Sequence, residues 1–256
     1  MVARAARVAI ALGVALLACA GPAATGTRPA SEDAVPTLEP ARETPLGAPR
    51  AEDGFLMPNA EDVDGTPAYV HYAREDMPIR VNVQLPKLAA RYASREQTDE
   101  GEIGAIRAWE TAIQAALPWF RLEIVRDDRD ADIQVEWRRR ITGDAAGWGG
   151  VKWQVIDGRL RVRGELQYAT RPCLAIECHL DLAELRLLVA HEFGHTLGLG
   201  HCLDCDSAMN YSWETVERVF VTDTDVQTIR ALYEIPSGTR VDGSLLIPLR
   251  GEASAR

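Results

Sequence analysis

The stretch from His191 to His201 constrains the fold of this chain more than any other, because it sets three histidines at fixed spacings. It reads H-E-F-G-H-T-L-G-L-G-H, the pattern H-E-x-x-H-x-x-G-x-x-H. On a helix of about 3.6 residues per turn, His191 and His195 project from one face and can share a metal ion. Gly198 can adopt the left-handed conformation that ends a helix, so that His201 returns from another direction. The sequence therefore predicts a metal site built from one helix and the turn after it.

The number of ligands indicates what kind of metal site this is. Three imidazole nitrogens leave one position of a tetrahedral zinc ion open, which is typical of catalytic zinc, whereas structural zinc has four protein ligands. Glu192 lies about 100° round the helix from His191, where its carboxylate can reach a water on the metal without binding the metal. We therefore expect Zn²⁺ as cofactor, with Glu192 as the general base. The predicted metal ligands are His191, His195 and His201.

A second motif, Ser207-Ala208-Met209-Asn210-Tyr211, follows the histidines. Together the two motifs resemble the extended signature of the metzincins, a group of zinc metallopeptidases, with their downstream Met-turn. The Met-x-Tyr spacing is similar to that of the astacin and serralysin branches. The resemblance implies that Met209 forms a hydrophobic floor beneath the histidines. It also implies a catalytic role for Tyr211, as a fifth ligand or a hydrogen-bond donor to the transition state; a tyrosine packed at the pocket wall is the alternative.

The resemblance also implies a fold. Residues 131–137 are similar to the strand that precedes the active-site helix in matrixin-like domains, which predicts an α+β, zincin-like fold. We expect a twisted mixed sheet packed on a long active-site helix, and a C-terminal subdomain with the Met-turn and a final helix. Asp181 with Glu184 forms a capping box that predicts the start of the active-site helix. Hydrophobic periodicity predicts strands at 79–85, 120–125, 132–137, 151–156 and 159–168, and further helices at 98–117 and 222–233.

One strand is the candidate for substrate binding. Metzincins hold the substrate backbone against an exposed strand, and residues 151–156 are the best candidate here, because the glycines at 147, 149 and 150 let the backbone approach a ligand. The turn at Asp157-Gly158 places residues 159–168 beside this strand. The alternative is that residues 159–168 form the edge of the sheet.

The first part of the chain predicts export. Residues 1–18 carry basic side chains followed by an apolar run, which is typical of a signal peptide and shorter than the roughly 20 residues of a spanning helix. Leu16-Leu17-Ala18-Cys19 resembles a bacterial lipobox, which implies that Cys19 carries a lipid and that the membrane is contacted only through this anchor. Ordinary cleavage near Ala20 or Ala24 is the alternative.

Composition divides the rest of the chain. Residues 19–67 are rich in Pro, Ala and acidic residues, which predicts a flexible tether or short propeptide. Residues 68–237 have globular composition and form the predicted catalytic domain, and residues 238–256 form a C-terminal tail. The formal net charge of −10 disfavours nucleic acid as a partner.

Cysteine usage fits an exported protein. Apart from Cys19, four cysteines remain, and an even number suggests two disulfides. We expect the local pairs Cys173–Cys178 and Cys202–Cys205. The alternative is a second, structural zinc held by four thiolates.

These observations predict an exported zinc metalloendopeptidase that acts on protein or peptide substrates through a zinc-activated water. We expect it in the cell envelope as a lipoprotein, or secreted. Two alternatives belong to other classes: a catalytically silent zinc-binding scaffold lipoprotein, and an amidase acting on cell-wall peptides. Glu192 argues against the scaffold, because a structural site does not need that carboxylate. The sequence predicts no oligomeric state.

Overall fold

The computed structural model describes residues 55–62, 64–86, 90, 92–141, 145–156, 159–169, 180–202, 205–210 and 221–246. Several predicted features lie outside these residues: the signal peptide, Cys19, the Asp157-Gly158 turn, Cys173, Cys178 and Tyr211.

The main sheet has five strands in the order β4-β3-β5-β7-β6. Their bounds are β3 Ile79–Asn82, β4 Leu122–Val125, β5 Ile133–Arg138, β6 Gly147–Ile156 and β7 Arg159–Ala169. Neighbouring strands run parallel except for β6, which is antiparallel to β7. The sheet is therefore mixed, and β6 lies at its edge. This order supports residues 151–156 as the edge segment, and the alternative that placed residues 159–168 at the edge is wrong.

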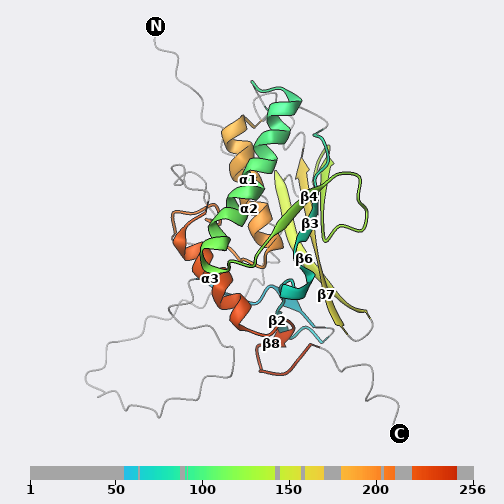
Figure 1. The fold of residues 1–256 in the computed structure, drawn as a ribbon, viewed down its shortest axis with the longest axis vertical. Helices are drawn as coiled ribbons and strands as arrows, with labels where there is room; N and C mark the ends of the chain where they lie inside the picture. Colours follow the sequence, from blue (N-terminus) through green and yellow to red (C-terminus); the bar gives the residue numbers. More distant parts are fainter. Residues whose placement is uncertain are drawn as a thin grey trace, which may run out of the picture.

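Two long helices pack beside each other against one face of this sheet, α1 (Arg95–Ala116) and α2 (Leu182–Thr196) (Figure 1). A third helix, α3 (Asp223–Glu234), contacts α1. All three begin with a capping box, in which a side chain before the helix and one in its first turn satisfy backbone N–H groups reciprocally. The mixed sheet and its helices confirm the predicted α+β class.

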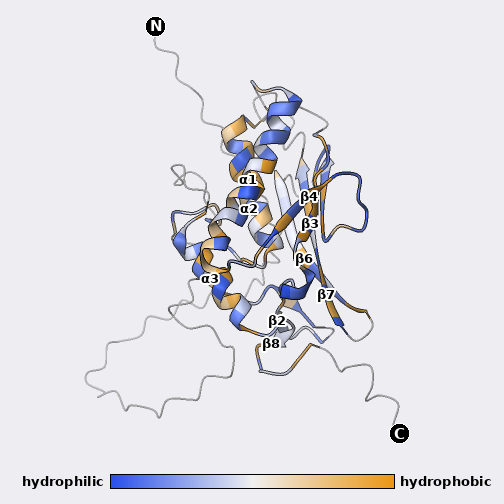
Figure 2. Cartoon of the chain, viewed as in Figure 1, coloured by the Kyte–Doolittle hydropathy of each residue, from blue (hydrophilic) through white to orange (hydrophobic). Residues whose placement is uncertain are grey.

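The hydrophobic core lies between the helices and the sheet. Apolar and polar residues are interleaved along each helix, as a one-sided core requires (Figure 2). The largest fully buried side chain is Trp109 of α1. Its indole Nε1 donates to the carbonyl oxygen of Ala190 on α2 over 2.9 Å. This bond fixes the two helices to each other immediately before the first predicted metal ligand.

A small second sheet joins the two ends of the described chain. Its order is β1 (Ala60–Glu61), β2 (Pro67–Tyr69), β8 (Thr239–Arg240), with antiparallel pairing throughout. A short 3-10 helix, η1 (Arg74–Asp76), follows β2. The folded unit therefore extends beyond both limits expected at residues 68 and 237, because β1 and β8 each pair with β2. None of the helices in the described part is long and apolar enough to cross a bilayer.

Candidate metal centre

Helix α2 carries the first two histidines, and its sequence explains their placement. Asp181 accepts from the backbone N–H of Glu184, whose carboxylate accepts from the N–H of Asp181, both over 2.8 Å. The helix therefore begins where the capping box predicts. Its apolar positions Leu185, Val189 and Phe193 are buried, as expected for a helix that packs on a core.

The end of α2 turns the chain back toward the site. Gly198 has a φ of +98°, in the left-handed region that favours glycine. A side chain is also excluded there by packing, because an added Cβ would lie 2.3 Å from Nδ2 of Asn59. Gly200 is packed against Met57 in the same way, because a Cβ added to Gly200 would lie 1.9 Å from the sulfur of Met57. The loop that leads to His201 is thus held against the segment before β1.

The three histidines converge. The Nε2 atom of His191 lies 3.2 Å from those of His195 and His201. One ligand atom from each residue can be chosen so that all three lie within 4.8 Å of one another. Zinc binds imidazole nitrogen at about 2.0–2.1 Å in tetrahedral geometry, which separates two such nitrogens by roughly 3.3–3.4 Å. The three side chains therefore fit a zinc ion.

Backbone carbonyls orient two of the rings. Nδ1 of His191 contacts the carbonyl oxygen of Ala208 at 2.6 Å, and Nδ1 of His195 contacts that of Leu199 at 2.8 Å. A carbonyl oxygen can only accept, so each Nδ1 carries the proton and each Nε2 presents a lone pair. Such outer partners fix the tautomer of a ligating histidine.

Burial keeps these rings neutral. It lowers the pKa of His191 to about 3 and that of His195 to about 4, with further lowering from the neighbouring histidines. Burial also lowers the pKa of His201. Neutral imidazole is the form that binds a metal, so the site is ready for one across the physiological pH range.

Glu192 is buried beside the histidines, against β6. Burial raises the pKa of its carboxyl to about 8, and a hydrogen bond from the backbone N–H of Gly149 opposes this. A Cβ on Gly149 would lie 2.1 Å from the carbonyl oxygen of Glu192, and one on Gly147 would lie 2.7 Å from Oε1 of Glu192. These glycines were expected to let a ligand approach. In the structure, Gly147 and Gly149 let the strand approach the helix that carries the candidate base.

Met209 lies under the histidine-bearing part of α2. Its side chain is fully buried, and a Cβ on Gly194 would lie 2.3 Å from its sulfur. Gly194 stands directly before His195 in the motif, so a glycine there makes room for the methionine. This is the position predicted for Met209. Tyr211, the other predicted residue of this motif, lies outside the described residues.

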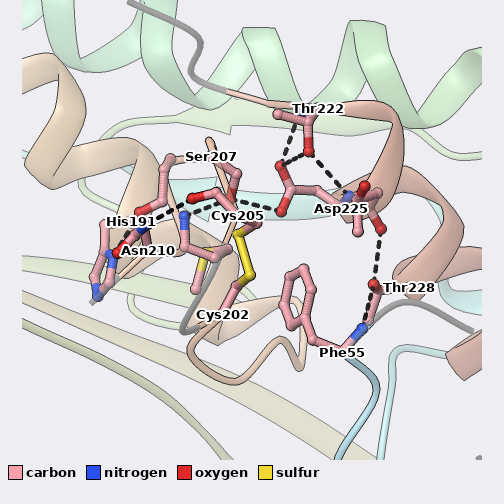
Figure 3. The surroundings of a disulfide bond; sticks show 12 residues. Phe55, His191, Cys202, Cys205, Ser207, Asn210, Thr222, Asp225 and Thr228 are labelled. Carbon is pink, nitrogen blue, oxygen red and sulfur yellow. Dashed lines mark hydrogen bonds between the residues drawn. A yellow bond between two sulfur atoms is a disulfide. The ribbon is translucent and has the colours of Figure 1, made fainter. Parts of the chain in front are cut away.

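Sequence reasoning missed the part that Ser207 and Asp225 play in supporting this turn. Oγ of Ser207 donates to Oδ1 of Asp225 over 2.9 Å and accepts from the N–H of Met209, also at 2.9 Å. Oδ2 of Asp225 accepts from the N–H and the hydroxyl of Thr222, at 2.7 and 2.8 Å (Figure 3). The capping box of Thr222 and Asp225 is visible in the sequence. The bond from Asp225 to Ser207 depends on tertiary packing.

A disulfide joins Cys202 to Cys205, as the local pairing predicted. Two oxidised cysteines cannot serve as thiolate ligands, so the alternative of a second zinc held by all four cysteines is wrong. The other expected pair, Cys173 with Cys178, lies outside the described residues.

Comparison with known proteins gives one family and several human relatives. The family model described as Matrixin, Peptidase_M10, matches residues 81–234. Neutrophil collagenase of Homo sapiens is 26% identical over 215 residues, covering 78% of this chain and 39% of that protein. Matrix metalloproteinase-15 of Homo sapiens is 28% identical over 142 residues, covering 52% of this chain and 21% of that protein. Matrix metalloproteinase-20 of Homo sapiens is 26% identical over 181 residues, covering 65% of this chain and 33% of that protein. This chain thus spans less than half the length of each relative.

Proposed function

This chain belongs to the matrixin family, and from that premise we propose that it is a zinc-dependent endopeptidase with Glu192 as its general base. The family match confirms the metzincin relationship that the histidine motif predicted. The convergence of the three Nε2 atoms, with a buried carboxylate next to them on the same helix, carries the proposal. The zinc ligands in this proposal are His191, His195 and His201.

When bound, zinc supplies a Lewis acid that polarises the scissile carbonyl and lowers the pKa of a water to about 7. The proton transfers are made by the protein's own residues. The carboxylate of Glu192 accepts the proton of the attacking water and later passes it to the leaving amine. A hydrogen bond from the backbone of Gly149 favours the ionised form of that carboxyl, because it lowers its pKa. A general base must be ionised, and a zinc ion held by the neutral histidines would favour the ionised form of Glu192 against the effect of burial.

The edge strand β6 is the surface that we propose for binding the substrate backbone. It pairs only with β7 in the described sheet, so its other side offers backbone groups to an extended peptide. Its first residues lie against Glu192, and this proximity of the edge strand to the proposed base supports the proposal. Protein or peptide chains are therefore the substrates that we propose. Tyr211 completes the proposed site as a hydrogen-bond donor to the transition state.

Replacing Glu192 by Gln tests the central assignment. The three imidazoles are unchanged and only the proton acceptor is lost, so zinc should stay bound while peptide turnover falls by at least about 100-fold. Zinc content and peptidase activity are measured on the same preparation. The matched variant His195→Ala should lose both. Wild-type turnover by a zinc-loaded E192Q protein would refute the role of Glu192.

We also propose export with lipid attachment at Cys19, on the strength of the lipobox-like residues 16–19. Changing Cys19 to Ser should move the protein from the membrane fraction to the soluble exported fraction. Fractionation of cells that express each form measures this. Equal amounts of both forms in the soluble fraction would favour ordinary signal cleavage instead.

A further inference from the structure

We propose that the Cys202–Cys205 disulfide is a positioning device for the third histidine and thereby sets the zinc affinity of the site. The inference rests on the proposed function, because it takes His201 as a zinc ligand. Cys202 and Cys205 are positioning residues here, since they act on the metal only through His201.

The backbone that follows His201 contacts the Met-turn. Cys202 is the next residue, and its N–H donates to the carbonyl oxygen of Met209 over 2.9 Å. Cys202 and Asn210 form a parallel β-bridge. The chain leaving the third ligand is therefore aligned with the Met-turn, which also provides the Ala208 carbonyl oxygen for His191.

The other half of the disulfide, Cys205, contacts the same turn. The carbonyl oxygen of Cys205 accepts from Nδ2 of Asn210 over 2.5 Å. Cys205 also lies two residues before Ser207, which is fixed by the buried Asp225. The disulfide thus links the backbone after His201 to a segment that is already anchored in the core, and Figure 3 shows it between His191 and Asp225.

The three proposed ligands lie on different kinds of backbone. His191 and His195 are held by a packed helix, and their rings are oriented by carbonyl oxygens. His201 lies on a loop and is only half-buried. Met57 touches this loop at Gly200, on the side that precedes His201. On the side that follows His201, the disulfide is the covalent restraint. Without it, the backbone contacts of Cys202 with Met209 and Asn210 would hold this side without a covalent link, zinc binding would have to restrict the remaining motion, and the affinity would fall.

The test compares two double variants of the full chain, Cys202→Ser with Cys205→Ser, and Cys173→Ser with Cys178→Ser as the matched control. Zinc affinity is measured by competition with a chelator, and the ligand geometry by the visible absorption of the Co²⁺-substituted protein. The first variant should bind zinc about 10–100-fold more weakly, as loss of a supporting partner typically causes, and should show an altered cobalt spectrum. The control should match the wild type in both measurements.

A second arm covers the case in which the first variant does not fold. A phosphine reductant, which contains no thiol, is added to folded wild-type protein. Zinc affinity should fall by the same factor in the wild type and in the Cys173/Cys178 variant. A folded Cys202/Cys205 variant should not respond. Unchanged affinity after the Cys202–Cys205 bond has been reduced, or equal affinity in a folded Cys202/Cys205 variant, would overturn the inference. If the oxidised wild type binds no zinc at all, the proposed function itself fails.

Discussion

The backbone of Gly149 lies directly against the backbone of Glu192, so the edge strand of the sheet packs on the residue that carries the candidate base. A methyl group on Gly149 would come within 2.1 Å of the Glu192 carbonyl oxygen. A hydrogen bond from the backbone of Gly149 also lowers the pKa of the Glu192 carboxyl, against the effect of burial. The strand proposed to bind the substrate and the carboxylate proposed to move the proton are therefore positioned by each other.

Gly149→Ala should disturb this contact. The added methyl forces β6 away from α2, because the atom that it meets belongs to the backbone. We expect a loss of about 1–3 kcal/mol in the free energy of unfolding and a drop in kcat/KM with zinc retained. Denaturant unfolding and peptidase assays measure the two effects. Gly104→Ala is the control: nothing lies within 4 Å of its added Cβ, and Ala in a helix should stabilise by about 1 kcal/mol. Equal behaviour of the two variants would contradict the proposed contact.

Proline substitutions in β6 should separate substrate binding from folding. The N–H of Ala169 donates to the carbonyl oxygen of Ala146, so those residues form a hydrogen-bonded pair. Hydrogen-bonded and non-hydrogen-bonded residue pairs alternate along an antiparallel ladder. The pairing of β6 with β7 is uninterrupted from Gly147 to Ile156, so this alternation continues along the whole strand. Val151 therefore turns its N–H toward the free edge, whereas Gln154 turns its N–H toward β7.

We expect Val151→Pro to fold, to keep zinc and to raise KM for peptides, because it removes a donor only from the free edge. Gln154→Pro should be the less stable of the two, because it removes a bond to β7. Thermal unfolding and steady-state kinetics decide this. The edge-binding model fails if Val151→Pro is well folded and has the wild-type KM.

Ser207→Ala should weaken the Met-turn. The change leaves the N–H of Met209 and Oδ1 of the buried Asp225 without the Ser207 hydroxyl. A buried polar group that loses its partner costs about 1–3 kcal/mol, which should appear in the free energy of unfolding. Zinc affinity should also fall, since the same turn orients His191. The exposed Ser244→Ala serves as control and should change stability by less than about 0.5 kcal/mol. A Ser207→Ala protein as stable as that control would show that this network is dispensable.

Glu102 should make stability depend on pH. It is fully buried on α1, and burial, followed by the charge of Asp99, raises its pKa to about 8 from an ordinary value of 4.5. Between these two values the folded state binds a proton that the unfolded state has released. Stability contributed by this group therefore falls as the pH rises from 4.5 to 8 and is level above 8.

Glu102→Gln should remove that slope, because an amide does not titrate. The variant should gain stability over the wild type as the pH rises, by up to about 1.4 kcal/mol for each unit of the pKa difference. Denaturant unfolding at several pH values from acid to alkaline measures the difference. The exposed Glu100→Gln on the same helix is the control and should follow the wild type. A constant difference between Glu102→Gln and the wild type across that range would refute the prediction.

Much of the metal site could be predicted from the sequence because its rules are local. The spacing of His191 and His195 on a helix, the capping box at Asp181 and the turn at Gly198 each involve residues a few positions apart. The helix start and the positive φ at Gly198 agree with those predictions. The Cys202–Cys205 disulfide is likewise a local pair.

The tertiary structure decided what depends on residues far apart in the chain. Sequence periodicity identified the strands β6 and β7, but only their pairing showed which of them is the edge. Sequence could not assign Gly149 to a contact with Glu192, or Asp225 to a bond with Ser207, because packing of separate elements creates both. The folded unit also reaches past residues 68 and 237, since β1 and β8 are too short to be recognised alone and become strands only by pairing with β2.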